Sequence, residues 1–444
     1  MITTDYQAIT KTKLKRITWL SSQDESKSFN NLMHLFNEDA LAVCYQELDA
    51  NKAIGIDGVD KAKYGSRLVE NIQELVGKLK NMAYIPGDIR EVKIPKEGSP
   101  GKYRTLGISN FEDKLCQKMM QKTLESIYDP IFLQCSYGFR AGIGCHDAIK
   151  GLTQHLYGNE VESVLDIDLA NFFGTIDRSV LTEMLQEKIK DKKLIRYIVR
   201  MFKAGVLSEG DLIIREEGVV QGSCASPVLA NIFAHYVLDK WFEEVVKQHC
   251  RGTVAMFRYC DDAVICCRYV EDATRIRIAL AKRLEKYKLK LNEEKTKMVR
   301  FSKKRLSQNV KQETFDFLGF TFYLGKSRKG RIIPKVKSCS GRISSKLKKV
   351  NDWCKDIRNK YKLPIIWKSF CSKLRGHIQY YGVSFNTQAV STFIWQSVKI
   401  MFKWLNRRSQ RKSFTWEKFN MFIERNPLPK VKIYHILTKE MPCE

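Results

Sequence analysis

Two adjacent acids interrupt an apolar run near the middle of the chain, in the stretch FRYCDDAVICC at 257–267. The residues on either side favour β-strands, so the pattern predicts a hairpin whose tight turn carries Asp261 and Asp262. Two neighbouring carboxylates can share a pair of divalent cations about 3.5 to 4 Å apart, the arrangement that activates a hydroxyl and neutralises a leaving pyrophosphate. Taken alone, the pair has a simpler explanation, because Asp is common in hairpin turns.

A second acidic pair, Asp166 and Asp168, lies in the stretch SVLDIDLANFF at 163–173. Residues i and i+2 of a strand face the same side, so both carboxylates share one face, although only one of them need be a metal ligand. An Asp-x-Asp pair also occurs in nucleotide-sugar transferases, and on a surface strand it can be merely solvated. Its value lies in its combination with Asp261 and Asp262 further along the chain.

The elements that must position these acids mix helices with antiparallel hairpins and contain no repeated βαβ unit. This order predicts an α+β protein with an antiparallel, palm-like sheet, and not a doubly wound sheet. At 444 residues the chain is long enough for two or three domains. The expected helices lie at 1–85 with a break at 53–60, and at 111–128, 179–190, 221–242, 271–288 and 340–425; the expected strands lie at 88–108, 163–173, 205–218, 257–267, 297–301 and 315–323.

The charge of the chain is strongly positive and unevenly placed. The formal net charge is +28, and residues 321–444 hold 28 Lys and Arg against 6 Asp and Glu, whereas residues 1–320 hold 49 against 43. The C-terminal part therefore resembles a basic appendage on a nearly neutral enzyme. Such an appendage suits the phosphate backbone of a nucleic acid. A membrane surface is the competing polyanion, but here the cations alternate with Trp and Tyr in helical patterns that have their own apolar cores.

The 13 cysteines show no C-x-x-C spacing, and the adjacent pair Cys266 and Cys267 lies within an apolar strand. They are expected to be buried thiols in a reducing compartment, with no zinc site. The N-terminus has no apolar signal region, and no apolar segment approaches membrane-spanning length. A soluble, cytoplasmic protein that does not bind membranes is therefore expected.

Several blocks in fixed order resemble those of group II intron reverse transcriptases and maturases. The Tyr-x-Asp-Asp block is Tyr259 to Asp262, and the acid followed by two aromatics is Asp168 with Phe172 and Phe173. The other blocks are IPKEGSPGKYRTLGI, SYGFRAGIGCHDAI, VVQGSCASPVLAN, LNEEKTK, FDFLGF, RGHIQYYGV and FKWLNRRSQRKSFTWEKF. Together they extend from about residue 15 to 435. The resemblance implies a right-hand polymerase with an N-terminal helical extension and the start of the fingers at 1–90, fingers and palm at 91–325, and a basic helical thumb or maturase domain at 326–444.

The resemblance also assigns roles to individual residues. Asp168, Asp261 and Asp262 would be the catalytic triad that holds two Mg²⁺ ions, with Mn²⁺ as a possible substitute. The incoming deoxynucleotide would contact Lys96, Arg104, Phe173, Gln221, Gly222 and Lys295; Phe173 would exclude a 2′-hydroxyl, and Lys295 would assist the leaving pyrophosphate. Lys96, Arg104 and Lys295 could instead be solvated charges, and Phe172 is expected to be a core residue. The primer end would be held by Phe317, Leu318 and Gly319.

RNA would be bound by the basic C-terminal part, where cations that neutralise phosphates alternate with aromatic rings that stack on bases. The residues expected to make these contacts are Arg375, His377, Tyr380, Tyr381, Lys403, Arg407, Arg408, Arg411 and Lys412.

Three positions depart from the family pattern. Gly174 stands where an Asp usually follows the two aromatics, Val220 replaces a Pro before the Gln-Gly pair, and Cys260 replaces the commoner Ala. None of these changes removes a metal ligand. Residues 431–444 leave little room for a DNA-binding segment with a zinc-dependent nuclease, so the chain resembles the short members that lack an endonuclease and must prime from an existing nick or fork.

The expected function is therefore RNA-directed DNA synthesis from a DNA primer with deoxynucleotides, together with binding of a parent group II intron RNA to assist splicing and retrohoming. Two alternatives stay open: a splicing cofactor with an idle polymerase, and a free-standing reverse transcriptase used in repair or phage defence. A DNA-templated polymerase or a nucleotide-sugar transferase would leave the other blocks and the basic C-terminus unexplained. By resemblance, the protein would reside in the bacterial cytosol and associate with the nucleoid when on DNA.

Overall fold

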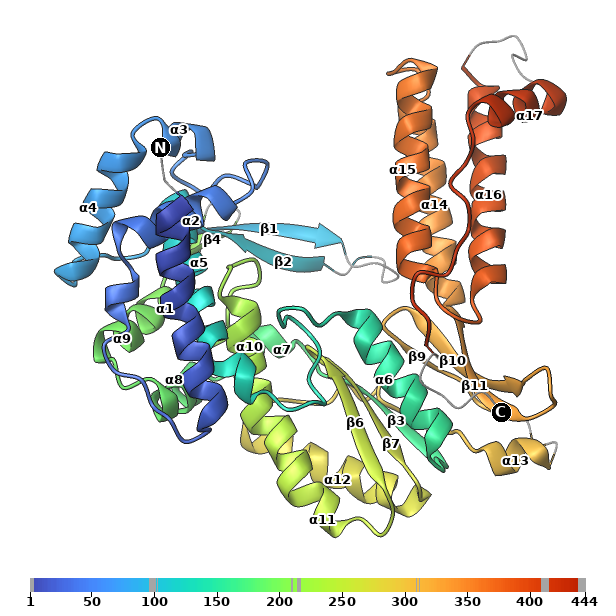
Figure 1. The fold of residues 1–444 in the computed structure, drawn as a ribbon, viewed down its shortest axis with the longest axis horizontal. Coiled ribbons are helices and arrows are strands. Elements are labelled where there is room, and N and C mark those ends of the chain that lie inside the picture. Colours follow the sequence, from blue (N-terminus) through green and yellow to red (C-terminus); the bar gives the residue numbers. More distant parts are fainter. Residues whose placement is uncertain are drawn as a thin grey trace.

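The computed structural model of the chain describes residues 4–95, 101, 103–208, 211–213, 217–308, 310, 312–408 and 415–437. The N-terminal helices gather at one end of the molecule, and a long hairpin extends from them toward a group of C-terminal helices, above a central sheet (Figure 1). Helices, antiparallel strands and hairpins alternate along the chain. The expected mixture of helices with antiparallel sheets is confirmed.

The helices of the N-terminal half are α1 (Thr4–Gln23), η1 (Met33–Leu35), α2 (Glu38–Glu47), α3 (Lys61–Gly65), α4 (Leu68–Lys80), α5 (Phe111–Tyr128), η2 (Asp129–Ile131), α6 (Cys145–Gly158), α7 (Phe172–Thr175), α8 (Arg178–Lys188) and α9 (Lys192–Phe202). Those of the C-terminal half are α10 (Ser226–Ala234), the π-helical segments η3 (His235–Asp239) and η4 (Phe242–Val246), α11 (Lys247–His249), α12 (Val270–Lys286), α13 (Lys303–Ser307), α14 (Ser340–Ile357), α15 (Leu363–Tyr381), α16 (Thr387–Leu405) and α17 (Trp416–Arg425). None of these helices combines the length and apolar character needed to cross a membrane.

The described residues form three sheets. The central sheet has the order β6 (Val254–Tyr259), β7 (Asp262–Cys267), β3 (Ser163–Asp168) and β8 (Lys297–Arg300), with every neighbouring pair antiparallel. The second sheet contains the long hairpin, in the order β2 (Tyr103–Ile108), β1 (Ile89–Pro95), β4 (Val206–Ser208) and β5 (Asp211–Ile213). The third has the order β11 (Ile332–Ser338), β10 (Phe320–Lys326) and β9 (Phe315–Phe317).

The central sheet separates two hydrophobic cores. Leu165 and Ile167 of β3 belong to a core built with the N-terminal helices, α10 and α12, whereas Val164 belongs to a core shared with α6 and the C-terminal helices. Successive side chains of a strand point to opposite faces, so Asp166 and Asp168 lie on the same face as Val164. The acids therefore share the side of the sheet on which the C-terminal elements lie.

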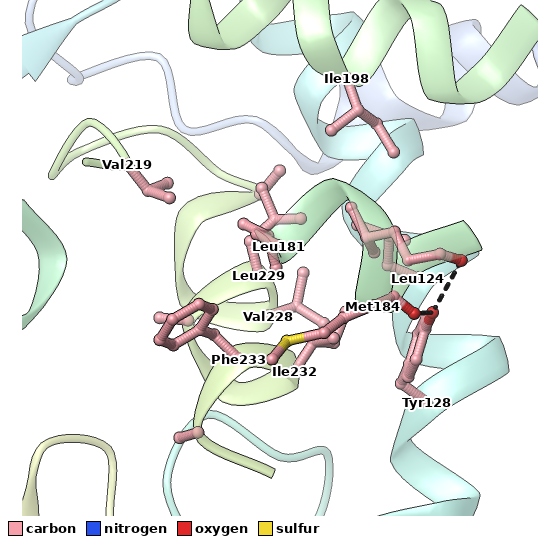
Figure 2. Packing of buried hydrophobic residues seen from close by; sticks show 14 of the residues in the cluster. Leu124, Tyr128, Leu181, Met184, Ile198, Val219, Val228, Leu229, Ile232 and Phe233 are labelled. Carbon is pink, nitrogen blue, oxygen red and sulfur yellow. Dashed lines mark hydrogen bonds between the residues drawn. The ribbon is translucent and has the colours of Figure 1, made fainter. Parts of the chain in front are cut away.

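The first core fixes the helices that support the sheet from the other side. Leu181 of α8 lies beside Val228, Leu229 and Phe233 of α10, all of them buried (Figure 2). At the edge of this group the hydroxyl of Tyr128, the last residue of α5, lies 3.2 Å from the backbone oxygen of Leu185 (Figure 2). This satisfies a polar group that burial would otherwise leave without a partner.

The sequence pattern predicts most of these elements, but it misses β11 and the helices α6 and α9. The hairpin at 88–108 and the helix at 111–128 are confirmed. The expectation that the chain is helical after Gly330 was incomplete, because Ile332–Ser338 forms β11 and pairs with β10. Helix α9 was also missed between the expected helix at 179–190 and the hairpin at 205–218.

Candidate functional site

The two acidic stretches meet at one end of the central sheet. β3 and β7 are antiparallel neighbours, and their register places Asp168 directly opposite Asp262. Tyr259 of β6 pairs with Asp262, so Cys260 and Asp261 form a two-residue turn, in which Cys260 has a φ of 62°. Positive φ at the first position of such a turn is usual for glycine and costs energy for other residues. The predicted hairpin with acids at its tip is thus confirmed.

Two acids of this site, Asp262 and Asp166, have a raised pKa. Burial, followed by repulsion from Asp261 and Asp168, raises the pKa of Asp262 to about 6. Burial and the nearby Asp262 also raise the pKa of Asp166, to about 7. The half-buried end of the sheet therefore holds an excess of negative charge. A cation placed there would relieve this repulsion.

Asp168 has direct partners in the chain segment that precedes β8. The amide Nδ2 of Asn292 donates to Oδ2 of Asp168 at 2.8 Å, and Nζ of Lys295 lies 3.2 Å and 3.3 Å from its two carboxylate oxygens. The backbone N–H of Asn292 also donates to the backbone oxygen of Asp168 at 2.8 Å. Lys295 was expected near the reaction centre. Asn292 was missed, although it lies in the same LNEEKTK block.

The donor set suits a hard cation. Asp168, Asp261 and Asp262 provide carboxylate oxygens only, which are the ligands that Mg²⁺ prefers, and Asp168 is 28% exposed at its side chain, so an ion and phosphates can reach it. Among the described residues, no three His, Cys, Asp or Glu side chains are already gathered closely enough to hold an ion. The carboxylate of Asp168 is instead neutralised by Lys295.

The aromatic pair after Asp168 divides into a core residue and a surface residue. Phe172 is buried, as expected, whereas Phe173 is half-buried. The backbone oxygen of Phe173 accepts a hydrogen bond from the N–H of Val219 at 2.8 Å, which ties it to the segment leading into Gln221. A Cβ at Gly174 would lie 2.4 Å from Nδ2 of Asn171, so the local fold accommodates glycine where the family has an acid.

The Gln-Gly turn contacts the long hairpin through its backbone. The N–H of Gly107 on β2 donates to the backbone oxygen of Gln221 at 2.6 Å. Gly222 has a φ of 110°, and a Cβ there would lie 2.4 Å from the backbone oxygen of Gly107. Only glycine permits this approach. A cavity of about 290 Å³ between the hairpin and the turn is lined by Thr105, Gly107, Gly174 and Gln221, among others.

The basic residues expected on the hairpin are only partly described. Arg104 is exposed on β2. Lys96 lies outside the described residues.

The expected primer-end residues form a second tight turn. Phe317 of β9 pairs with Phe320 of β10, so Leu318 and Gly319 make the connection, both with positive φ as in a type I′ turn. The hydroxyl of Tyr380 on α15 donates to the backbone oxygen of Leu318 at 2.8 Å, and Cys339 donates its N–H to that of Gly319 at 3.0 Å. Phe317 and Gly319 are buried and Leu318 is half-buried, so Leu318 is the residue of this motif that is most open to solvent.

The basic C-terminal residues separate into an exposed group and a buried one. Arg375, Lys403 and Arg407 are exposed, and Arg408 is half-buried and donates to the backbone oxygen of Tyr361 at 3.2 Å. Tyr380 is half-buried and is engaged with Leu318. Arg411 and Lys412 lie outside the described residues.

Two of the expected RNA contacts are wrong. His377 is 5% exposed and stacks on Phe393 with ring centres 3.6 Å apart, and Tyr381 is 1% exposed. Both point into the core between the C-terminal helices, because the helical repeat of RGHIQYYG places them on the apolar side of α15 with Leu374 and Ile378. They stabilise the helical core and do not present their rings to a nucleic acid.

Opposed acids at one end of an antiparallel sheet are the arrangement that a nucleic acid polymerase requires. Residues 94–322 match the family model described as "Reverse transcriptase (RNA-dependent DNA polymerase)". The match covers more than half of the 444 residues, and the chain belongs to this reverse transcriptase family.

Curated relatives narrow the assignment. The chain is 34% identical to the group II intron-encoded protein LtrA of Lactococcus lactis subsp. cremoris over 229 residues, which cover 51% of this chain and 38% of LtrA. It is 28% identical to protein YkfC of Escherichia coli K12 over 370 residues, which cover 74% of this chain and 93% of YkfC. A 91 kDa protein in the cob intron of Schizosaccharomyces pombe is 31% identical over 245 residues, or 53% of this chain and 29% of that protein. The resemblance to group II intron reverse transcriptases and maturases is thus confirmed, although the alignment spans less than half of LtrA.

Proposed function

We propose that the protein is an RNA-directed DNA polymerase that copies RNA into complementary DNA by adding deoxynucleotides to a primer. One observation carries the proposal: in a chain of the reverse transcriptase family, the strand register sets Asp168 opposite Asp262, with Asp261 beside them. Nucleotidyl transfer needs closely spaced carboxylates where a primer hydroxyl meets an α-phosphate. The separation of these acids in the sequence shows that the fold, and not local spacing, creates the pair.

The arrangement of elements supports a right-hand layout. The central sheet is the palm, the β1–β2 hairpin with the N-terminal helices makes the fingers, and α14 to α16 make a thumb (Figure 1). The corresponding domains are an N-terminal helical extension with the start of the fingers at 1–90, the fingers and palm at 91–325, and a basic helical thumb or maturase domain at 326–444. A duplex would then lie on the face of the sheet that carries Asp168.

In the proposed catalytic centre, Asp168, Asp261 and Asp262 would hold two Mg²⁺ ions, for which Mn²⁺ could substitute. When bound, these ions supply Lewis acidity at the primer hydroxyl and neutralise the charge of the leaving pyrophosphate. Asn292 orients the carboxylate of Asp168 through its hydrogen bond. Lys295 exchanges its ion pair with Asp168 for the pyrophosphate as that charge develops.

The incoming nucleotide would lie between the hairpin and the sheet. Arg104, together with Lys96, would contact its triphosphate, since a guanidinium can bind two phosphate oxygens at once. Phe173 would lie beneath the sugar and exclude a 2′-hydroxyl, while Gln221 and the backbone at Gly222 would contact the nucleotide. The hydrogen bond between Gly107 and Gln221 supports this placement, because it joins the hairpin to the turn.

The primer end would rest on the turn at Leu318 and Gly319, next to Phe317. The hydrogen bond from Tyr380 links this turn to α15, so that primer position and the C-terminal helices are mechanically connected. Exposed cations of these helices, including Arg375, Lys403 and Arg407, would bind RNA phosphates.

A second role, the binding of a parent group II intron RNA to assist splicing and retrohoming, is favoured by the names of the relatives, which include a group II intron-encoded protein and a protein in the cob intron. The basic C-terminal part supplies the charge that structured RNA requires. A splicing cofactor that does not use its polymerase activity would bind RNA in the same way, but it would not need Asp168 and Asp262 to lie opposite each other.

The proposal is tested by extension of a DNA primer on an RNA template with deoxynucleotides and Mg²⁺, using wild type and Asp261→Asn. Extension by wild type and none by Asp261→Asn is expected, with both proteins binding RNA equally. Equal extension by the two proteins would refute the assigned centre, and RNA binding without extension by either would favour the splicing cofactor.

A further inference from the structure

Arg258 is the largest fully buried side chain of the central sheet, and it immediately precedes the acidic block. It is 0% exposed and forms an ion pair with Asp239, also 0% exposed, at 2.5 Å. Burying two charges is costly, and an apolar pair of similar volume is often at least as stable. The pair is therefore expected to serve some purpose other than stability.

The guanidinium of Arg258 makes five hydrogen bonds to four partners, one of which belongs to the turn. Nε and Nη2 donate to the two carboxylate oxygens of Asp239 at 2.7 and 2.5 Å. Nη2 also donates to Oγ of Ser136 at 2.6 Å, and Nη1 donates to Oδ1 of Asn231 at 3.1 Å. The remaining bond runs from Nη1 to the backbone oxygen of Cys260 at 3.0 Å. Arg258 thus holds the peptide that joins Cys260 to Asp261.

Gly138 also packs closely against this turn. The backbone of Gly138 lies so close that a Cβ there would be 2.5 Å from the backbone nitrogen of Cys260. Gly138 is in turn fixed by Asn231, whose Nδ2 donates to its backbone oxygen at 2.5 Å. Asn231 therefore bonds both Arg258 and Gly138. A buried cation and a glycine therefore both contact the turn, and both are hydrogen-bonded to the same residue of α10.

This confinement matters because Cys260 adopts a φ of 62°. A residue other than glycine persists in this conformation only where its surroundings impose it. Asp239 belongs to the π-helical segment η3, a type of distortion that often marks functional sites. The distortion, the buried pair and the unusual turn are joined by hydrogen bonds into one unit.

We propose that Arg258 is a positioning residue for nucleotidyl transfer: by holding the carbonyl of Cys260, it fixes the direction in which Asp261 and Asp262 project from the turn. The effect of Arg258 on nucleotidyl transfer rests on the proposed function. Its effect on the conformation of the turn does not. Asp239 and Asn231 act through Arg258. Without this network the turn would relax toward ordinary φ, and Asp261 would no longer lie beside the Asp168–Asp262 pair.

The test separates positioning from stability. The double variant Arg258→Met with Asp239→Leu removes both charges together, so no unpaired charge is left in the core. Arg258→Lys keeps the charge but loses the planar fork. Arg200→Lys is the matched control, because Arg200 also donates to backbone oxygens, those of Met82 and Tyr84, at a place remote from the turn.

Three quantities are measured for each full-length protein: the urea midpoint of unfolding, amide hydrogen exchange of the peptide covering 257–263, and the affinity for Mn²⁺ by the loss of the free-ion electron paramagnetic resonance signal. For the double variant we expect a midpoint close to wild type, turn amides that exchange about tenfold faster, the scale of one lost hydrogen bond from a charged donor, and weaker Mn²⁺ binding. Arg200→Lys should match wild type in turn exchange and Mn²⁺ binding.

Unchanged exchange and unchanged Mn²⁺ affinity in the double variant would overturn the inference. If the double variant does not fold, Arg258→Lys decides by the same two readouts. Failure of the proposed function can be distinguished from failure of this inference. In that case the wild-type protein would make no complementary DNA, but substitution of Arg258 would still speed the amide hydrogen exchange of the turn. If the role of Arg258 and the proposed function are both correct, the double variant should also extend primers at least about tenfold more slowly than wild type. The reason is that the charge-assisted hydrogen bond that positions the turn is lost.

Discussion

Asp168 and Asp262 are direct cross-strand partners in the central sheet. Their carboxylates share one face, and repulsion from Asp168 contributes to the raised pKa of Asp262. The stability of the sheet gains nothing from this juxtaposition, since like charges opposite each other are unfavourable. The cost is understandable if the pair holds cations during nucleotidyl transfer.

Sugar selection should depend on Phe173. Replacing it with Ala removes the half-buried ring that would meet a 2′-hydroxyl, so ribonucleotide incorporation should rise relative to deoxynucleotide incorporation. Single-nucleotide kinetics with matched ribo- and deoxynucleotides measures the ratio of kcat/KM values. Phe172→Ala is the contrasting variant: it empties a buried site and should lower the free energy of unfolding by about 3 to 5 kcal/mol. Unaltered sugar preference in Phe173→Ala would exclude the gate role.

Lys295 should contribute to the chemical step. Lys295→Met removes a cation that contacts both oxygens of Asp168. We expect kcat to fall by about 10²-fold, on the scale of lost general-acid or electrostatic assistance, with little change in the binding of primer and template. Lys297→Met, an exposed neighbour on β8, is the control. Rapid-quench measurement of a single nucleotide addition gives the rate of the chemical step directly. An unchanged rate in Lys295→Met would show that Lys295 is a solvated charge with no part in this step.

The exposed cations of the C-terminal helices should set the salt dependence of RNA binding. Substituting Arg375, Lys403 and Arg407 with Gln removes three candidate phosphate contacts. The slope of log K against log salt should then become shallower by about 2, at about 0.7 per contact for single strands. The control replaces the exposed Arg275, Lys282 and Lys286 of α12, which packs against β3 and β7. Equal slopes for the two triple variants would contradict the assigned surface.

Acid should destabilise the C-terminal helices through His377. Burial lowers the pKa of His377 to about 3, and within the described residues neither ring nitrogen has a hydrogen-bond partner. The folded pKa lies below the unfolded value of about 6.5, so the unfolded chain binds the proton more readily. Stability is therefore lost as pH falls from 6.5 toward 3, by up to about 1.4 kcal/mol per pH unit for this group.

The comparison is between wild type and His377→Leu, by urea unfolding at several pH values. The variant should lose one part of the acid dependence and keep another, because burial also lowers the pKa of His235 to about 3. An identical pH dependence in both proteins would show that His377 does not stay neutral in the folded state.

Local patterns predict the elements of the site well. Strand alternation in SVLDIDL and FRYCDDAVICC predicts which residues share a face, and the Asp-Asp pair predicts the turn. The long hairpin and the helix after it are set by equally local signals. By contrast, β11 was missed because RIIPKVKS is basic and contains Pro334, a residue that strands disfavour away from edges. In the structure β11 lies at the edge of its sheet, where this proline is tolerated.

Long-range partners could not be predicted from one sequence. Asn292 and Arg258 act through contacts with Asp168 and Asp239, and no spacing rule indicates that those residues are adjacent. The same limit explains His377 and Tyr381: a cluster of basic and aromatic residues suggests RNA binding, but which side of the helix is buried depends on α16, whose Phe393 covers His377. Charge and composition identify the class of partner, whereas packing decides which side chains reach it.

The central claim is tested most directly by comparing Asp168→Asn with Asp166→Asn in primer extension on an RNA template. Both substitutions lie on one face of the same strand and change one oxygen to nitrogen, but only Asp168 is opposite Asp262, while Asp166 is opposite Val264. We predict no extension by Asp168→Asn and continued extension by Asp166→Asn, with equal RNA binding. Normal extension by Asp168→Asn would contradict the account.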